Sequence, residues 1–280
     1  MVNTSIIIRA RNEVQWLRLL LPLLKKQTVQ DFEIILVNNK STDGSVDFAL
    51  ENSCKVLSIE EYTPGRALNI GVSSSEGNNI VFLSAHCLPV KDNWLIELIE
   101  EFEKFSELNC AGLYGRQVPS DISSNQTIRD LAITFGPEHR IQKIDSFFHN
   151  ANAIISREAW KKIPFDETVS NIEDRIWARE QQKLGKCVVY SPKAPVIHYH
   201  GIHQDNNQSR IRGTRETLMK YGVVKVYPVK KMFSNVAVIF ANEASEKILS
   251  KTIKMLLNLK KTSLIDMIVL VGQNNKVGEK

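Results

Sequence analysis

The chain has 280 residues, of which 43% are hydrophobic and 24% are charged, and its formal net charge is +5. This is the balance of an ordinary globular protein with a substantial core. The positive charge is mild and dispersed, which excludes the clustered basic face of a nucleic-acid-binding protein and suits an anionic ligand such as a nucleoside diphosphate.

The first half of the chain alternates between short apolar runs and segments with helical spacing. The apolar runs, typical of strands covered on both faces, are residues 6–8, 34–37, 55–59 and 79–84. Apolar residues at helical spacing span residues 13–26, 66–73 and 93–105. This alternation predicts an α/β fold, with a mostly parallel sheet and helices on both faces.

The second half is less regular. One helix is expected at residues 128–135, within a polar stretch. Beyond it we expect a strand at 147–155, a helix at 171–184, short strands at 188–190 and 196–200, and a helix at 210–221. These elements complete a predicted domain of residues 1–222.

The character of the sequence changes after Gly222, so residues 223–280 are predicted to be a separate extension. A strand at 235–240, a helix at 248–259 and a strand at 265–271 form a β-α-β pattern that resembles the opening of a sugar-activating nucleotidyltransferase domain. Its loop at 241–247 lacks the glycines with which such a loop holds phosphate, so we assign the extension no chemistry.

Polar motifs follow the expected strands at their carboxyl ends, where open α/β sheets bind ligands. Guanidinium groups offer forked donors to phosphate oxygens, and asparagine amide oxygens can accept a hydrogen bond from a base or a ribose. The motifs are Arg9-Ala10-Arg11-Asn12-Glu13, Asn38-Asn39 and Ser84-Ala85-His86.

In order and spacing, these motifs resemble the family 2 glycosyltransferases of the GT-A fold, over roughly residues 5–222. Gly65-Arg66-Ala-Leu-Asn69-Ile-Gly71 and Asn171-Ile-Glu173-Asp174 belong to the same pattern. The resemblance implies inverting transfer of a sugar from a UDP-, dTDP- or GDP-linked donor to a glycan or lipid-linked acceptor. The pattern is most similar to bacterial enzymes of surface polysaccharide synthesis, including rhamnosyltransferase-like members.

In that family a carboxylate on a late helix takes the proton from the acceptor hydroxyl, and Glu173-Asp174 is the matching pair. We expect Asp174 to be the general base. A purely structural role is the alternative, because acidic residues favour a helix N-terminus and Asn171 with Asp174 fits a capping box. The catalytic role is favoured because Arg175 and Trp177 continue the family pattern.

The family's metal motif, Asp-x-Asp or Asp-x-His, is replaced here by Ser84-Ala85-His86. His198 and His200 are two residues apart in an expected strand, so their side chains should share a face. We expect His86 with His198 or His200 to hold Mn²⁺ or Mg²⁺, since the family often completes its metal site with a late histidine. The alternative is a metal-independent site in which the diphosphate is neutralised by Arg9, Arg11, Arg66 or Lys40.

The resemblance assigns the other polar residues to two subsites. The nucleotide site would comprise Arg9, Ala10, Arg11, Glu13, Asn38, Asn39, Arg66, Asn69, Ser84 and Ala85. The acceptor or sugar site would comprise His149, Asn150, Asn152, Arg175 and Trp177. The indole of Trp177 would form an apolar platform for a sugar ring or belong to the core.

The four cysteines are dispersed and lack metal-ligand spacing, which indicates reduced thiols of a cytosolic protein. We see no apolar run long enough to span a membrane and no signal peptide. We therefore expect a cytoplasmic protein. If it works at a membrane, we expect it to associate peripherally with the inner face of that membrane.

A second function stays open. The absence of aspartate at positions 84 and 38 favours a catalytically silent relative that binds nucleotide sugar or glycan as a partner protein. The presence of Glu173-Asp174 and of the histidines favours catalysis.

Overall fold

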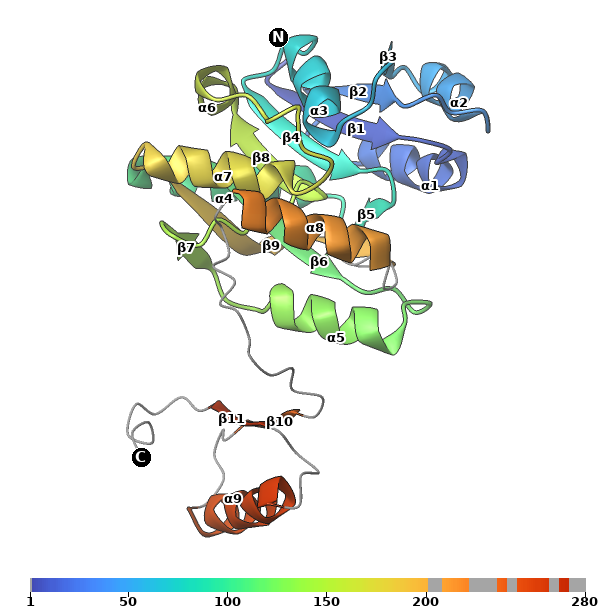
Figure 1. Ribbon diagram of the computed structural model, residues 1–280. Helices are drawn as coiled ribbons and strands as arrows, with labels where there is room; N and C mark the ends of the chain where they lie inside the picture. The colour runs from blue at the N-terminus through green and yellow to red at the C-terminus, as the bar shows by residue number, and fades with distance from the viewer. Residues whose placement is uncertain (1, 201–207, 222–235, 241–245, 262–266, 272–280) are drawn as a thin grey trace. The chain divides into compact units, whose positions relative to one another are not determined.

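The computed structural model describes residues 2–200, 208–221, 236–240, 246–261 and 267–271 (Figure 1). The chain divides into two compact units, residues 1–224 and 225–280. Within the described residues, no helix combines the length and the apolar character that crossing a membrane requires.

The first unit is built on one mixed sheet with the strand order β3-β2-β1-β4-β8-β6-β9-β5, and β7 pairs with β9. Its first four strands run parallel, β8 runs antiparallel to both neighbours, and β9 runs parallel to β6. The strands are β1 (Thr4–Ala10), β2 (Phe32–Asn38), β3 (Lys55–Ser58), β4 (Asn79–Ser84), β5 (Cys87–Pro89), β6 (Cys110–Val118), β7 (Arg140–Gln142), β8 (Asn152–Ser156) and β9 (Cys187–His198).

Helices cover both faces of this sheet. Strand alternation in β1 sends Ile6 and Ile8 to a core shared with α1, α2 and α4, and Ile7 to a second core shared with α3, α5, α6 and α7. The helices are α1 (Val14–Lys25), α2 (Ser45–Glu51), α3 (Pro64–Ser73), α4 (Trp94–Lys104), α5 (Asn125–Thr134), α6 (Arg157–Lys162), α7 (Glu173–Lys183) and α8 (Gln208–Lys220).

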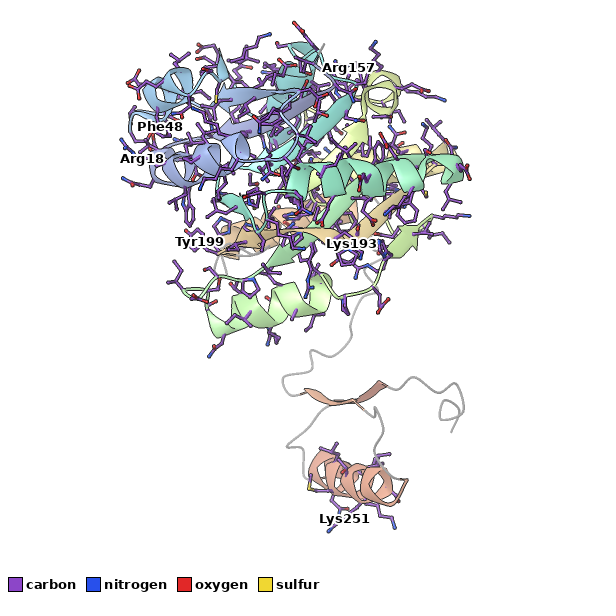
Figure 2. The ribbon with its side chains drawn as sticks, turned by 180° about the vertical axis from the view of Figure 1, so that it is seen from behind. Arg18, Phe48, Arg157, Lys193, Tyr199 and Lys251 are labelled. Carbon is purple, nitrogen blue, oxygen red and sulfur yellow. The ribbon has the colours of Figure 1, made fainter. Side chains whose placement is uncertain are left out.

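Figures 1 and 2 show these two faces in turn. The front view has α3 and α7 before the sheet, and the rear view has α1 and α2 on the opposite side. There Arg18 of α1 lies over the ring of Phe48 of α2, with its guanidinium carbon 5.1 Å from the ring centroid. The predicted α/β fold with helices on both faces is confirmed.

Two expectations for the second half of this unit were wrong, and one strand was missed. The strand expected at 147–155 begins only at Asn152, which leaves residues 147–151 as a loop. The two short strands expected around residues 188–200 are one strand, β9, whose pairing with β6 shifts register between Gly115 and Gln117. Prolines lack the amide donor of a regular ladder, so the bulge falls where β9 contains Pro192 and Pro195. Strand β6 was not predicted.

The second unit pairs β10 (Val236–Phe240) in parallel with β11 (Met267–Val271), and α9 (Glu246–Lys261) connects them in sequence. The predicted β-α-β pattern of the extension is therefore present. Most of the loop compared with a phosphate-binding loop, residues 241–245, lies outside the described residues.

Gly65, at the start of α3, lies against the backbone of the segment that leads to α7. A Cβ added at this position would lie 2.1 Å from the carbonyl oxygen of Asp166. The neighbouring cap is regular, because the Thr63 hydroxyl accepts a hydrogen bond from the Arg66 amide. The close approach therefore depends on the absence of a side chain at residue 65.

We expect Gly65→Ala to lower the free energy of unfolding by about 2 kcal/mol, because backbone atoms must move to relieve the overlap. Gly136→Ala is the matched control, since a Cβ at Gly136 would meet no atom within 4 Å. Denaturant unfolding of both variants measures the difference. Equal stability of the two variants would contradict this account of the α3 contact.

Candidate active site

A pocket of about 310 Å³ lies at the carboxyl ends of β1 and β4 and at the N-terminus of α7. It gathers residues from distant parts of the sequence, as the strand-end motifs predicted. The predicted site residues that line it are Arg9, Ala10, Arg11, Glu13, Asn39, Ser84, His86, His149, Asn150, Glu173, Asp174, Arg175, His198 and His200.

The motif on α3 does not reach this pocket. Asn69 is 8% exposed, and its amide donates to the carbonyl of Phe165 and to the carboxylate of Glu167, both at 2.9 Å. Arg66 forms ion pairs with Glu61 at 2.9 Å and with Glu167 at 3.1 Å. Neither Arg66 nor Asn69 lines the pocket, and their polar groups instead hold the segment before α7 against α3.

Two residues predicted to touch the sugar belong to the core. Asn152 is fully buried, where it accepts a hydrogen bond from the Trp94 indole and donates to the carbonyl of Ala194. Trp177 is 1% exposed, and its indole donates to the carbonyl of Ile163. Neither residue lines the pocket, and Trp177 has the core position that was the alternative to a sugar platform.

Two more of the predicted nucleotide-binding residues, Asn38 and Ala85, are buried within the domain. Asn38 is 6% exposed, and its side-chain oxygen accepts a hydrogen bond from the Ser41 amide. Ala85 is 1% exposed and packs in the apolar core. Neither residue lines the pocket: the Asn38 side chain bonds within the turn that follows β2, and Ala85 packs in the core.

The N-terminus of α7 has an unusual backbone. Ile172 precedes the helix with φ 54° and ψ 26°, in the left-handed region that β-branched residues rarely adopt. The capping-box interpretation was wrong, because no side chain caps this helix and Asn171 instead bonds Thr214 and Thr217 of α8. Ile172, directly before Glu173, therefore has a strained backbone conformation, which costs about 1–3 kcal/mol.

Glu173 is held by Arg9, a residue of β1. The guanidinium and the carboxylate are 2.8 Å apart, and their side chains are 24% and 6% exposed. Arg9 also donates to the carbonyl of Pro64 at 3.4 Å. This ion pair links the central strand of the parallel half of the sheet to the start of α7, and it commits both charges to each other.

Asp174 has a different environment. It is 9% exposed, and its two carboxylate oxygens accept backbone hydrogen bonds from Asn150 at 3.2 Å and from Arg175 at 2.8 Å. Burial, followed by the charge of Glu173, raises the pKa of Asp174 to about 6, although Arg175 acts in the opposite direction. A carboxylate with this pKa in a pocket is a candidate for proton transfer near neutral pH.

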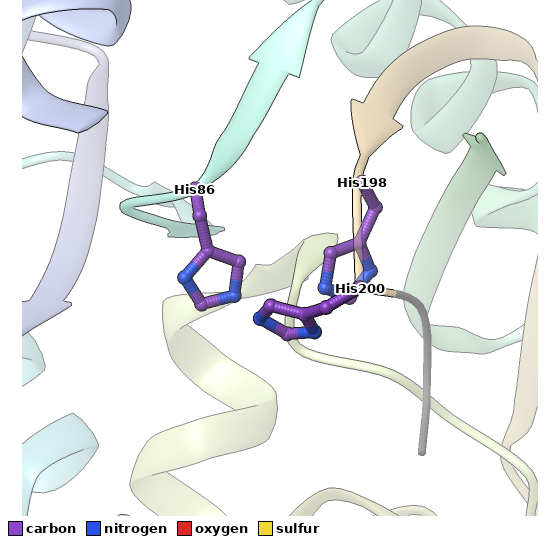
Figure 3. Close-up of side chains that lie close together, drawn as sticks. All are labelled: His86, His198 and His200. Atoms are coloured by element: carbon purple, nitrogen blue, oxygen red, sulfur yellow. The ribbon is translucent and has the colours of Figure 1, made fainter. Parts of the chain in front are cut away.

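Three histidines that line the pocket lie close together (Figure 3). Ligand-capable atoms of His86, His198 and His200 all lie within 4.8 Å of one another. His198 ends β9 and His200 lies beyond it, so strand alternation is not what brings them together. The carboxylate of Glu13 faces His86 at 3.5 Å, which makes Glu13 a neighbour of the histidines.

Sequence reasoning missed several residues of this site. Gln117 of β6 bridges His149 and His198, while Tyr62 and Thr214 line the pocket. Strand β6 was not predicted, so nothing in the sequence connected Gln117 with the histidines. Ile172 could not be found from side-chain chemistry, because its side chain is apolar and its distinctive feature is its left-handed backbone.

A search of family models matches residues 5–163 to "Glycosyl transferase family 2". The chain belongs to this family. It is also 30% identical over 222 residues to EpsH of Bacillus subtilis (strain 168), whose name describes it as a glycosyltransferase. That alignment covers 71% of this chain and 60% of EpsH, so the family 2 chain spans about 60% of the length of this relative.

Solved structures share the fold at low sequence identity. The Pyrobaculum calidifontis mannosyltransferase PcManGT, solved with GDP-Man and Mn²⁺, matches with TM-score 0.60 and 14% identity over 81% of this chain and 66% of its own. TarS of S. aureus with UDP-GlcNAc matches with TM-score 0.56 and 18% identity over 80% and 68%. Mycobacterium tuberculosis glucosyl-3-phosphoglycerate synthase, with Mn²⁺ and UDP, matches with TM-score 0.57 and 13% identity over 82% and 84%. The family 2 chain therefore has the GT-A fold.

The Arg9–Glu173 pair supports a stability prediction. Arg9→Met should lower the free energy of unfolding by about 3 kcal/mol, because it leaves the buried Glu173 carboxylate without its partner charge. The double variant Arg9→Met/Glu173→Leu should recover most of that loss, since it leaves no unpaired charge. Denaturant unfolding in a double-mutant cycle measures the coupling, and additive losses would contradict it.

Proposed function

We propose that the chain is an inverting glycosyltransferase that moves a sugar from a nucleotide-sugar donor to a hydroxyl of a glycan or lipid-linked acceptor. The observation that carries this proposal is Asp174, a carboxylate with a raised pKa that lines a pocket shared with the histidine cluster. Family membership supplies the reaction class, and the solved neighbours with GDP-Man or UDP-GlcNAc support a nucleotide-sugar donor.

Asp174 is the proposed general base, with the acceptor hydroxyl as the group it deprotonates. Its backbone hydrogen bonds from Asn150 and Arg175 hold the carboxylate in place without neutralising it by an ion pair. Glu173 is less suited to this role, because Arg9 already binds its carboxylate. The deprotonated hydroxyl attacks the anomeric carbon as the bond from that carbon to the nucleoside diphosphate breaks, and this single displacement inverts the configuration there.

The donor diphosphate is proposed to lie between the end of β1 and the histidines. Arg11 lines the pocket with an exposed side chain, and its guanidinium can bind phosphate oxygens through forked donors. Asn39 and Ser84 line the same pocket and offer hydrogen-bonding groups to the nucleotide. His149, Asn150 and Arg175 are proposed for the sugar or acceptor side.

The residues present fit a divalent cation. Three imidazoles within 4.8 Å of one another can each supply one nitrogen ligand, so His86, His198 and His200 would hold the ion. The structures with Mn²⁺ support a cation in this fold. A bound cation would supply positive charge to the leaving diphosphate.

The cellular setting is a further part of the proposal. The sequence resembles bacterial enzymes of surface polysaccharide synthesis. This resemblance favours a cytoplasmic protein that meets its acceptor at the inner face of the membrane. A net charge of +5 is compatible with peripheral contact to anionic lipid.

Asp174→Asn is expected to reduce sugar transfer by about 10²–10⁴-fold, because the amide cannot take a proton. The assay offers UDP-, dTDP- and GDP-linked sugars to the full chain, and calorimetry measures nucleotide binding, which should persist in the variant. Glu180→Gln is the control, since Glu180 lies on the same helix and pairs with Lys183 outside the pocket. Undiminished transfer by Asp174→Asn would reject the base assignment. Nucleotide binding without any transfer by the wild type would favour the silent relative.

Transfer should decline as the pH falls through about 6, because Asp174 is active only as the carboxylate and burial and Glu173 raise its pKa to that value. Charged neighbours that act on Asp174 are Glu173 and Arg175 of α7 and Arg9 of β1. A profile of kcat/KM against pH measures the inflection. An inflection at about 3.9, the ordinary value for aspartate, would contradict the role of burial.

A further inference from the structure

The histidine cluster differs from an oxygen-rich cation site in its donor atoms. All three members are imidazoles, and Ser84 occupies the position where the family pattern has a carboxylate. The nearby acid, Glu13, lies on the Nδ1 side of His86 at 3.5 Å. The protein therefore presents neutral nitrogen ligands to an ion, and this determines which ions it favours.

Gln117 determines how His198 presents its nitrogens. The amide oxygen of this 1% exposed glutamine lies 2.6 Å from Nδ1 of His198, and its amide nitrogen lies 2.9 Å from Nδ1 of His149. An amide oxygen only accepts hydrogen bonds, so in this arrangement Nδ1 of His198 carries the proton. The lone pair of His198 is then on Nε2, the nitrogen that would ligate an ion.

Glu13 acts on His86 in the same way. Its carboxylate faces Nδ1 at 3.5 Å, and the negative charge favours a proton on that nitrogen. The lone pair of His86 is then also on Nε2. His86, in the turn after β4, and His198, at the end of β9, thus each have a polar group behind Nδ1. This arrangement is typical of histidines that ligate metals.

We propose that this cluster is a site for an imidazole-preferring transition-metal ion, such as Co²⁺, Ni²⁺ or Zn²⁺, and that it favours these ions over Mn²⁺ and Mg²⁺. Gln117 and Glu13 are its positioning residues. Imidazole suits these later ions, whereas Mg²⁺ and Mn²⁺ favour carboxylate, carbonyl and water oxygens. Three protein ligands leave coordination positions for oxygens of the donor diphosphate, a step that rests on the proposed function.

The metal affinities, together with a histidine variant and the spectrum of bound Co²⁺, test the donor set, because most ligand sets already bind Ni²⁺ and Co²⁺ more tightly than Mn²⁺. Titration calorimetry of the untagged full chain, without nucleotide, should show Ni²⁺ and Co²⁺ binding at least about 10-fold more tightly than Mn²⁺, with Mg²⁺ weakest. The visible absorption of bound Co²⁺ should change in His200→Ala, which removes one imidazole. Equal affinities for Co²⁺ and Mg²⁺, or an unchanged Co²⁺ spectrum in His200→Ala, would overturn the proposal.

Variants of Gln117 test the positioning role. Gln117→Leu removes the acceptor behind His198 and should weaken Co²⁺ binding by about 10–100-fold. Gln117→Glu keeps an acceptor there and should retain the affinity. Gln181→Leu is the matched control, because Gln181 is fully buried and bonds the carbonyl of Ala159, away from the cluster. Equal Co²⁺ affinity of the folded Gln117→Leu and Gln181→Leu proteins would overturn the role of Gln117.

These measurements are separate from the proposed transfer reaction. If the affinity order holds but no donor sugar is transferred, the proposed function fails and the metal site stands. If transfer occurs and the affinity order is reversed, the metal proposal fails and the transferase stands.

Discussion

The ion pair between Arg9 and Glu173 joins the two parts of the chain that form the site. It connects β1, in the middle of the parallel strands, to the first residue of α7, across 164 positions of sequence. Because Glu173 is buried, the pair holds only while both elements keep their places. The neighbouring Asp174 is thereby fixed at the pocket, and the strained backbone at Ile172 is maintained by the same contacts together with Asn171 and α8.

The fold and the position of the pocket could be predicted because both follow from local patterns. Continuous apolar strands and amphipathic helices predicted the layers of the fold, and the polar motifs at the strand ends predicted the position of the site. Strand β6 could not be predicted, because its interior glycines weaken any strand signal. Tertiary packing explains why glycine stands at these positions. A Cβ at Gly112 would meet Ile155 at 2.7 Å, and one at Gly115 would meet the Asn152 amide at 2.3 Å.

The same limit applies to the predicted site residues that the structure places away from the pocket. Asn69, Asn152 and Trp177 have the polar or aromatic groups of binding residues, but each uses them on buried partners within the domain. A sequence motif indicates that a polar side chain is needed at a position. It does not reveal whether the hydrogen-bond partner of that side chain is a ligand or a backbone carbonyl. Gln117 shows the reverse case, because an ordinary glutamine gains a possible function only through its contacts with two histidines.

The charges that remain in the pocket favour a metal-assisted site over the arginine-only alternative. Arg9 is paired with Glu173, Arg66 is paired outside the pocket, and Lys40 faces Glu60 at 3.8 Å. Of the four proposed cations, Arg11 alone lines the pocket without an ion pair among the described residues, and Arg175 of α7 is a further arginine in the pocket. Carboxylate ligands would cancel part of a metal ion's charge. Neutral imidazoles would leave all of it for the leaving group, so the loss of aspartate at position 84 need not weaken catalysis.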